Sequence, residues 1–153
     1  MKFREAVEAT VSIRDAYRDG LQALRHGDRK HVDAQDRRSL AGSVDLDTAC
    51  KHSHPNDPRW DYAVAYQRAK SHPGDVFWIE VHPVRTEDHR AEVRRKFDWL
   101  KVWLAAEGKR LRAFPAFYVW IASGKTSFTS TSPQIRALAQ LGVLFAGRHY
   151  RIR

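Results

Sequence analysis

The chain lacks the features that mark several classes of protein. Its single cysteine, Cys50, excludes an intrachain disulfide and favours a reducing compartment, so we expect a cytoplasmic protein. It has no run of about 18 apolar residues, and its charged N-terminus lacks the apolar middle region of a signal peptide. We therefore expect neither a transmembrane helix nor a membrane partner.

Several catalytic and binding motifs are also missing. There is no Gly-x-Ser-x-Gly nucleophile motif, which leaves serine or cysteine hydrolase chemistry with little support. Cys50, His52 and His54 stand at alternate positions and do not form the paired spacing of a structural zinc site. The segment 123–126 ends like a phosphate-binding loop but lacks the upstream glycine. Within it, Lys125 is either a contact to a nucleic-acid backbone or part of an ordinary polar loop.

Acidic residues are scarce relative to basic ones. The 27 lysines and arginines against 18 acids give a net charge of +9, which attracts polyanions, most commonly nucleic acid. The basic residues are spread through folded segments rather than gathered in one long run, which favours a charged surface on a folded protein. Arg94 and Arg95, in such a segment, are candidate nucleic-acid-binding residues, with DNA favoured as the partner.

The periodicity predicts a single α/β domain spanning residues 1–153. A hydrophobic content of 42% supports a globular fold. The expected order is helix, three strands, helix, strand, which gives an α/β/α sandwich around a mixed sheet. The expected helices cover about 3–26, about 87–107 and a short stretch opened by Ser132–Pro133, and the expected strands cover about 40–48, 60–66, 76–82, 116–122, 143–145 and 150–152, with a polar loop at 28–40.

Two acids inside apolar strands are the most informative feature. Asp61 and Glu80 stand 19 positions apart, a spacing that suits adjacent strands of one sheet. A buried carboxylate is costly unless something compensates it, and a divalent cation held between the two would do so. Salt bridges to nearby arginines are the alternative. A shared cation would provide the minimum equipment for metal-assisted phosphodiester hydrolysis.

This element order and these acids resemble the PD-(D/E)XK nuclease superfamily. Asp61 looks like its first acid, and Glu80-Val81-His82 looks like its second motif, with His82 where the family usually has lysine. The resemblance implies Mg²⁺ or Mn²⁺ bound by Asp61, Glu80 and the Val81 carbonyl, with His82 orienting or activating water. It also implies that the following helix can supply the lysine, for which Lys96 is the candidate, although a lysine near an apolar face can equally snorkel to the surface.

The sequence leaves further alternatives open. Asp45 and Asp47 alternate on the first predicted strand, where they either add an acid to the metal site or simply face solvent. The leading hypothesis is a metal-dependent nuclease acting on DNA, with RNA as the alternative substrate. The others are a non-catalytic nucleic-acid-binding module and a structural or interaction protein. The oligomeric state is open, a homodimer included.

Overall fold

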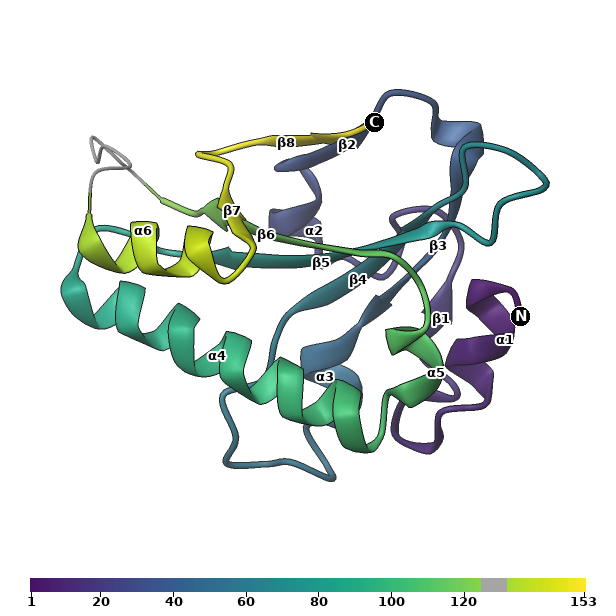
Figure 1. Ribbon diagram of the computed structural model, residues 1–153, viewed down its shortest axis with the longest axis horizontal. Coiled ribbons are helices and arrows are strands. Elements are labelled where there is room, and N and C mark those ends of the chain that lie inside the picture. Colours follow the sequence, from purple (N-terminus) through teal and green to yellow (C-terminus); the bar gives the residue numbers. More distant parts are fainter. Residues whose placement is uncertain (125–131) are drawn as a thin grey trace.

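A six-stranded mixed sheet forms the centre of this computed structural model, which describes residues 1–124 and 132–153 (Figure 1). The strands lie in the order β1-β3-β4-β5-β6-β7. Neighbours from β1 to β5 are antiparallel, whereas β5, β6 and β7 are parallel. The strand bounds are β1 Tyr17–Arg18, β3 Leu40–Asp45, β4 Tyr62–Tyr66, β5 Asp75–His82, β6 Ala116–Ala122 and β7 Val143–Phe145.

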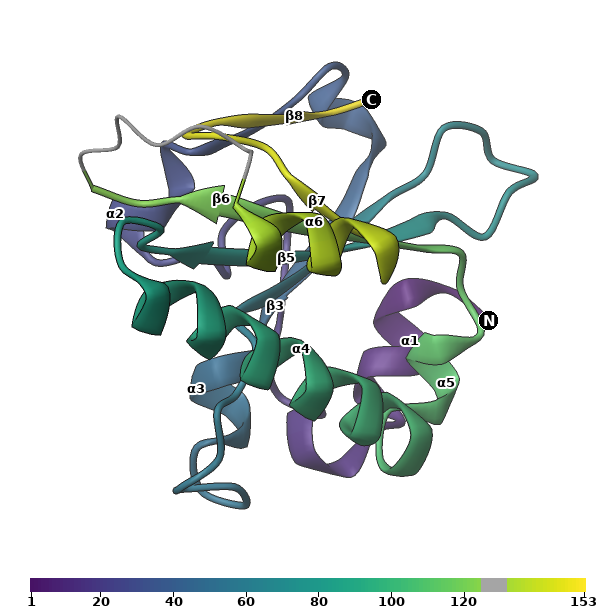
Figure 2. The ribbon, with the colours of Figure 1, turned by 60° about the vertical axis from the view of Figure 1, so that its left-hand side comes forward.

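Helices cover one face of this sheet. Figures 1 and 2 show the long helix α4 running beneath the sheet, with the shorter helices of this layer beside it. Their apolar side chains share one buried cluster with the sheet, and this cluster includes Trp60, Trp78 and Phe97. The helices of this layer are α1 Phe3–Glu8, α3 Leu46–Cys50, α4 Glu87–Ala106, α5 Lys109–Arg112 and α6 Pro133–Gln140.

The opposite face is covered by a thinner layer. It contains the short helix α2 (His26–Arg29) and a two-stranded parallel sheet of β2 (Val32–Ala34) and β8 (Tyr150–Ile152). A second buried cluster, which includes Val64 and Ile79, fills the space beneath it. The predicted α/β class is therefore confirmed, and the second cover layer is partly β. The core order helix, three strands, helix, strand is met by α1, β3, β4, β5, α4 and β6, with shorter elements between them.

Strand β5 is buried on both faces, and its alternation positions the acids. Val76 and Trp78 pack in the cluster beneath α4, whereas Phe77 and Ile79 pack in the opposite one. Successive strand residues point to opposite faces, so Glu80 falls on the α4 side. Between Asp75 at its start and His82 at its end, the central strand is thus apolar except for Glu80, which faces the long helix.

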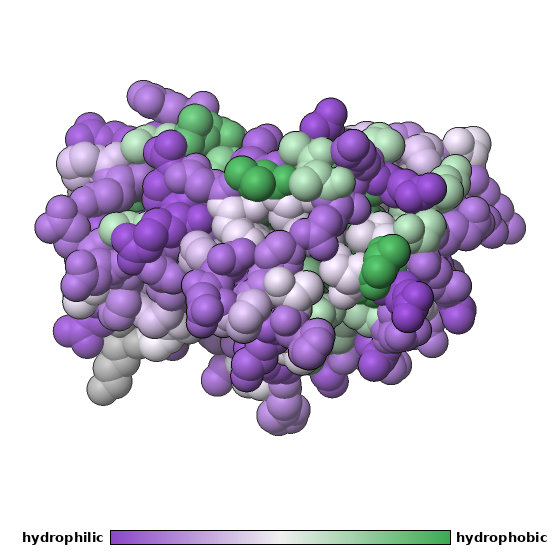
Figure 3. All heavy atoms as spheres, turned by 90° about the horizontal axis from the view of Figure 1, so that it is seen from below, coloured by the Kyte–Doolittle hydropathy of each residue, from purple (hydrophilic) through white to green (hydrophobic). Residues whose placement is uncertain are grey.

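Helix α4 follows the predicted periodicity closely. The Thr86 hydroxyl caps the first turn by accepting a hydrogen bond from the His89 backbone N–H. In return, His89 Nδ1 accepts a hydrogen bond from the Thr86 N–H. Val93 and Leu100 lie buried on its inner face. The helix ends at Ala106, one residue before the predicted limit. Beneath this layer the molecular surface is mostly hydrophilic, with small separate hydrophobic areas (Figure 3).

The predicted N-terminal helix over residues 3–26 is wrong. The helix ends at Glu8, and the Thr10 hydroxyl donates a hydrogen bond to the Ala6 carbonyl just beyond it. The presumed apolar stripe does not face one core, because Val11 is 81% exposed and Leu24 packs in the cluster on the far side of the sheet. The chain passes instead through the 3₁₀ helix η1 (Val11–Ile13) and the edge strand β1.

Two other boundaries differ from the prediction. The strand expected over 40–48 ends at Asp45, where α3 begins, and the polar stretch 28–40 contains β2 and the 3₁₀ helix η2 (Arg37–Ser39). A three-residue strand is too short for its alternation to be distinguished from a loop. None of the helices in the described part of the chain has both the length and the apolar character that a membrane span requires.

Candidate functional site

Asp61 and Glu80 meet at one end of the antiparallel pair β4–β5. Asp61 directly precedes β4, and Glu80 lies near the end of β5. The Asp61 N–H donates to Glu80 Oε1 (3.1 Å), and the Val81 N–H donates to Asp61 Oδ2 (3.0 Å). Both residues are buried, with 4% of Asp61 and 0% of Glu80 exposed. The two carboxylates are therefore fixed by the backbone of each other's strands.

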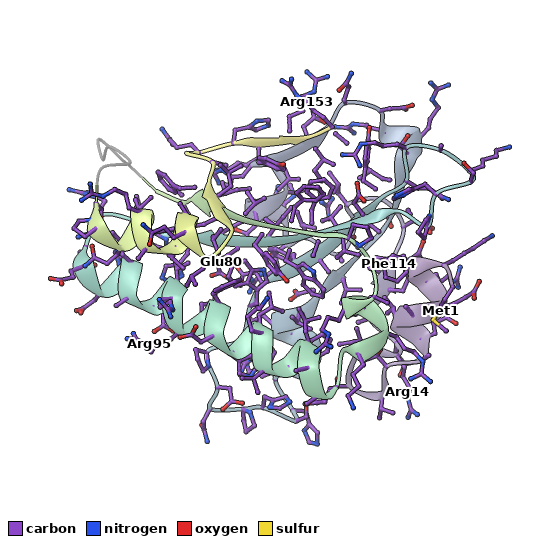
Figure 4. The ribbon with its side chains drawn as sticks, viewed as in Figure 1. Met1, Arg14, Glu80, Arg95, Phe114 and Arg153 are labelled. Carbon is purple, nitrogen blue, oxygen red and sulfur yellow. The ribbon has the colours of Figure 1, made fainter. Side chains whose placement is uncertain are left out.

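Lys96 reaches both acids from α4. Its ammonium donates to Asp61 Oδ1 at 3.3 Å and forms an ion pair with Glu80 Oε2. Only 12% of the Lys96 side chain is exposed, so it does not extend to the surface. Figure 4 shows Glu80 between the sheet and α4, whereas Arg95 points away from both. The structure therefore brings together Asp61, Glu80 and the lysine of the following helix.

A second cation, Arg25, approaches Asp61 from the other side. Its Nη2 lies 3.3 Å from Asp61 Oδ1, and its Nε donates to the Tyr62 hydroxyl at 2.7 Å. That hydroxyl donates in turn to Asp28 Oδ2 at 2.6 Å. Arg25 also contacts Asp47 at 3.4 Å. Sequence reasoning missed Arg25 because it lies within the region predicted as helix 3–26, where a lone arginine carries no signal.

His82 lies at the margin of the same site. Its Nδ1 is 3.5 Å from Glu80 Oε2, and its ring packs edge-on against His89 at 6.0 Å between centroids. Burial and the nearby charge of Lys96 lower the pKa of His82 below its ordinary value. The lowered pKa favours the neutral imidazole at pH 7.

Burial dominates the electrostatics of the two acids. It raises the pKa of Asp61 to about 7, the charge of Glu80 adds to the rise, and Lys96 opposes it. Burial likewise raises the pKa of Glu80 to about 7, again against the charge of Lys96. Burial alone would lower the pKa of Lys96, but the charges of Glu80 and Asp61 outweigh it and raise that pKa. Lys96 therefore remains protonated between two carboxylates that titrate near neutrality.

Asp45 does not join the two acids. Its carboxylate caps α3 by accepting hydrogen bonds from the Thr48 N–H (2.9 Å) and hydroxyl (2.8 Å). Asp47 lies within α3 and pairs with Arg59 at 2.9 Å. Both acids were predicted on one strand. Because β3 ends at Asp45 and α3 begins at Leu46, Asp45 caps the helix and Asp47 lies within it.

The predicted nucleic-acid contacts lie apart from this cluster. Arg94 pairs with Asp98 at 3.0 Å, and Arg95 pairs with Glu92 through its Nε at 2.9 Å; both arginines are at exposed positions of α4. These intrahelical pairs hold both arginines along the helix surface. Lys125 lies outside the described residues.

The oxygen atoms at this site are of the type that a hard divalent cation prefers as ligands. Asp61 and Glu80 offer carboxylate oxygens. The Val81 N–H donates a hydrogen bond to the Asp61 side chain, and the N–H and carbonyl of one strand residue lie on the same edge of the strand. The Val81 carbonyl therefore also faces Asp61. Mg²⁺ is commonly held by one or two carboxylates plus water and substrate phosphates. Within the described residues, however, no group of three or more His, Cys, Asp or Glu side chains could hold a metal. The Lys96 ammonium takes the place of a shared cation between the two acids.

No family model, curated protein or solved structure matches this chain.

Proposed function

We propose that this chain is a metal-dependent nuclease that hydrolyses phosphodiester bonds of DNA. The observation that carries the proposal is the meeting of Asp61, Glu80 and Lys96 in one buried cluster from two strands and the long helix. The net charge of +9 supports a polyanionic substrate. The cluster also agrees with what the resemblance to the PD-(D/E)XK superfamily implies for these three residues.

Each group has a role that follows from its charge and position. Asp61 and Glu80, with the Val81 carbonyl, would hold Mg²⁺ or Mn²⁺, which when bound stabilises the negative charge that develops on phosphate. Lys96 is protonated, so it acts as a hydrogen-bond donor that stabilises negative charge and cannot act as a general base. The neutral His82 imidazole, beside Glu80, is the group suited to take a proton from the attacking water.

Arg25 supplies a cation on the solvent side of the cluster. Its side chain is about half exposed, while its guanidinium contacts Asp61 and the Tyr62 hydroxyl. A guanidinium held in this way can bind a phosphate oxygen with its outward N–H groups. Arg25 would therefore hold the substrate backbone next to the acids.

The test is cleavage of plasmid, single-stranded and branched DNA with Mg²⁺, Mn²⁺ or EDTA. Glu80→Gln should remove metal-dependent cutting. Asp75→Asn is the matched control, because Asp75 is a buried acid at the other end of β5 that pairs with Arg68. Thermal unfolding of all variants checks that each is folded. Cutting by folded Glu80→Gln at the parent rate, or no cutting by the parent on any substrate, would overturn the proposal.

A non-catalytic nucleic-acid-binding module is the second candidate, and one observation favours it. The two buried acids are already compensated by Lys96 and Arg25, so the fold itself needs no metal. This reading expects DNA binding that weakens with salt, is indifferent to EDTA and occurs without cleavage. Glu80→Gln would then leave binding unchanged.

A further inference from the structure

A cavity of about 440 Å³ opens on the face of the sheet opposite α4. Residues of β5, β6, β7 and β8 line it, and none of these lining residues belongs to the candidate site described above. Phe77 lines the cavity, whereas Glu80, three positions later on β5, points to the other face. The cavity is therefore a separate feature of the molecule.

The floor of this cavity is aromatic and unusually exposed. Phe117 is 46% exposed and Leu144, on the edge strand β7, is 52% exposed. The Phe117 ring stacks on Phe77 with centroids 4.9 Å apart and planes 16° apart, and Tyr150 lies 6.1 Å from Phe77. A further flat ring could extend this stack on the open surface of Phe117.

The rim of the cavity is basic. Arg68, Arg151 and Arg153 line it, and among the described lining residues none is acidic. Arg68 pairs with Asp75, Arg151 stands in register beside Asp33 of β2, and both Arg151 and Arg153 are exposed. Figure 4 shows Arg153 on the side of the molecule away from α4. An aromatic floor bordered by arginines is the combination that binds the bases and phosphates of a single strand.

We propose that this surface, made of Phe77, Phe117, Leu144 and the three rim arginines, binds single-stranded DNA. A base would stack on Phe117 while Arg151 and Arg153 hold the neighbouring phosphates. Duplex DNA does not fit this role, because its bases are stacked inside the helix and cannot reach an aromatic platform. The choice of DNA over RNA rests on the proposed function, whereas the single-stranded preference rests on the cavity.

The experiment measures fluorescence anisotropy of a labelled oligothymidine, the matching duplex and an oligouridine, with EDTA present so that no metal-dependent cleavage occurs. Phe117→Ala should raise Kd for the DNA single strand about 5- to 160-fold, the range expected for one lost base stack. Arg151→Gln should reduce the slope of log K against log salt by about 0.7. Val102→Ala and Arg14→Gln are the matched controls, because both residues are exposed far from the cavity lining.

Phe117→Leu guards against a variant that fails to fold, because it keeps apolar bulk on Phe77 while removing the ring. Parent-like binding by folded Phe117→Leu and Arg151→Gln would overturn the proposal, as would tighter binding of the duplex or of oligouridine by the parent. The comparison of single strand with duplex is independent of the nuclease proposal, and only the comparison of oligothymidine with oligouridine depends on it. Weaker single-strand binding by the Phe117 variants supports this surface even if the parent cuts no DNA, and loss of cutting in Glu80→Gln leaves binding in EDTA unchanged.

Discussion

Replacing Lys96 with methionine tests the charge balance of the buried cluster most directly. Methionine keeps the length and the apolar stem of the side chain but removes the ammonium that lies between Asp61 and Glu80. Removing one partner of a buried ion pair costs about 3–5 kcal/mol, because the remaining charge is left uncompensated. Arg25 still contacts Asp61, so we expect a loss near the lower limit, about 3 kcal/mol at pH 8.

This loss should depend on pH in a defined direction. The carboxyls of Asp61 and Glu80 titrate near 7 in the parent, and without Lys96 their pKa values rise further. At pH 5 both are protonated in the folded variant, so little uncompensated charge remains. Lys96→Met should therefore lose much less stability at pH 5 than at pH 8.

Urea unfolding at both pH values measures the difference, and a thermal scan at pH 8 should show Tm lowered by about 6–12 °C. Lys101→Met is the matched control, because Lys101 is an exposed lysine on the same helix. Adding Glu80→Gln to Lys96→Met should restore part of the stability. A loss below about 1 kcal/mol at pH 8, as expected of an exposed ion pair, or an equal loss at both pH values, would refute the reasoning.

Three further predictions follow from other parts of the structure. Asp45→Ala should cost about 1 kcal/mol of stability through the lost cap of α3 and leave any metal-dependent cleavage intact, measured by urea unfolding beside a plasmid assay; loss of cleavage at full stability would return Asp45 to the site. Gly108→Ala should cost about 1–3 kcal/mol, because the added Cβ would lie 2.4 Å from the buried Trp103 ring, and an unchanged Tm would contradict this. In the parent, burial holds the pKa values of Asp61 and Glu80 above those of unfolded carboxyls, so the folded state binds more protons and stability should fall as pH rises from about 4 to about 7. Glu80→Gln should make the free energy of unfolding, measured in urea, depend less on pH. An equal pH dependence in the variant and the parent would contradict the assignment.

The sequence predicted the parts of the fold that long periodic segments encode. Helix α4 and the strands β4, β5 and β6 were found within about two residues of their predicted limits, because their apolar spacing matches one period over many residues. The prediction of the N-terminal helix failed because apolar residues three or four positions apart can also belong to two different hydrophobic clusters. Phe3 and Leu24 fit one helical stripe on paper but pack on opposite faces of the sheet.

The candidate site was predictable only in part. Asp61 and Glu80 stand out because each is the lone acid of a predicted apolar strand, and the structure places them together. The role of Lys96 depends on how α4 lies across the sheet, which no local pattern encodes, and a snorkelling lysine has the same spacing. Arg25 carries no local signal, because its contact with Asp61 joins positions 36 apart through the tertiary fold.

The pairing of β2 with β8 has a consequence for how the chain is made. Val32 pairs in register with Tyr150, so this small sheet cannot form until nearly all of the described chain has left the ribosome. Until then the apolar side chains of β4 and β5 that it covers, Val64 and Ile79 among them, stay open to solvent. Contacts between such distant positions form slowly. The nascent protein therefore carries an uncovered apolar face late into synthesis, and this is the stage at which we expect it to depend on chaperones.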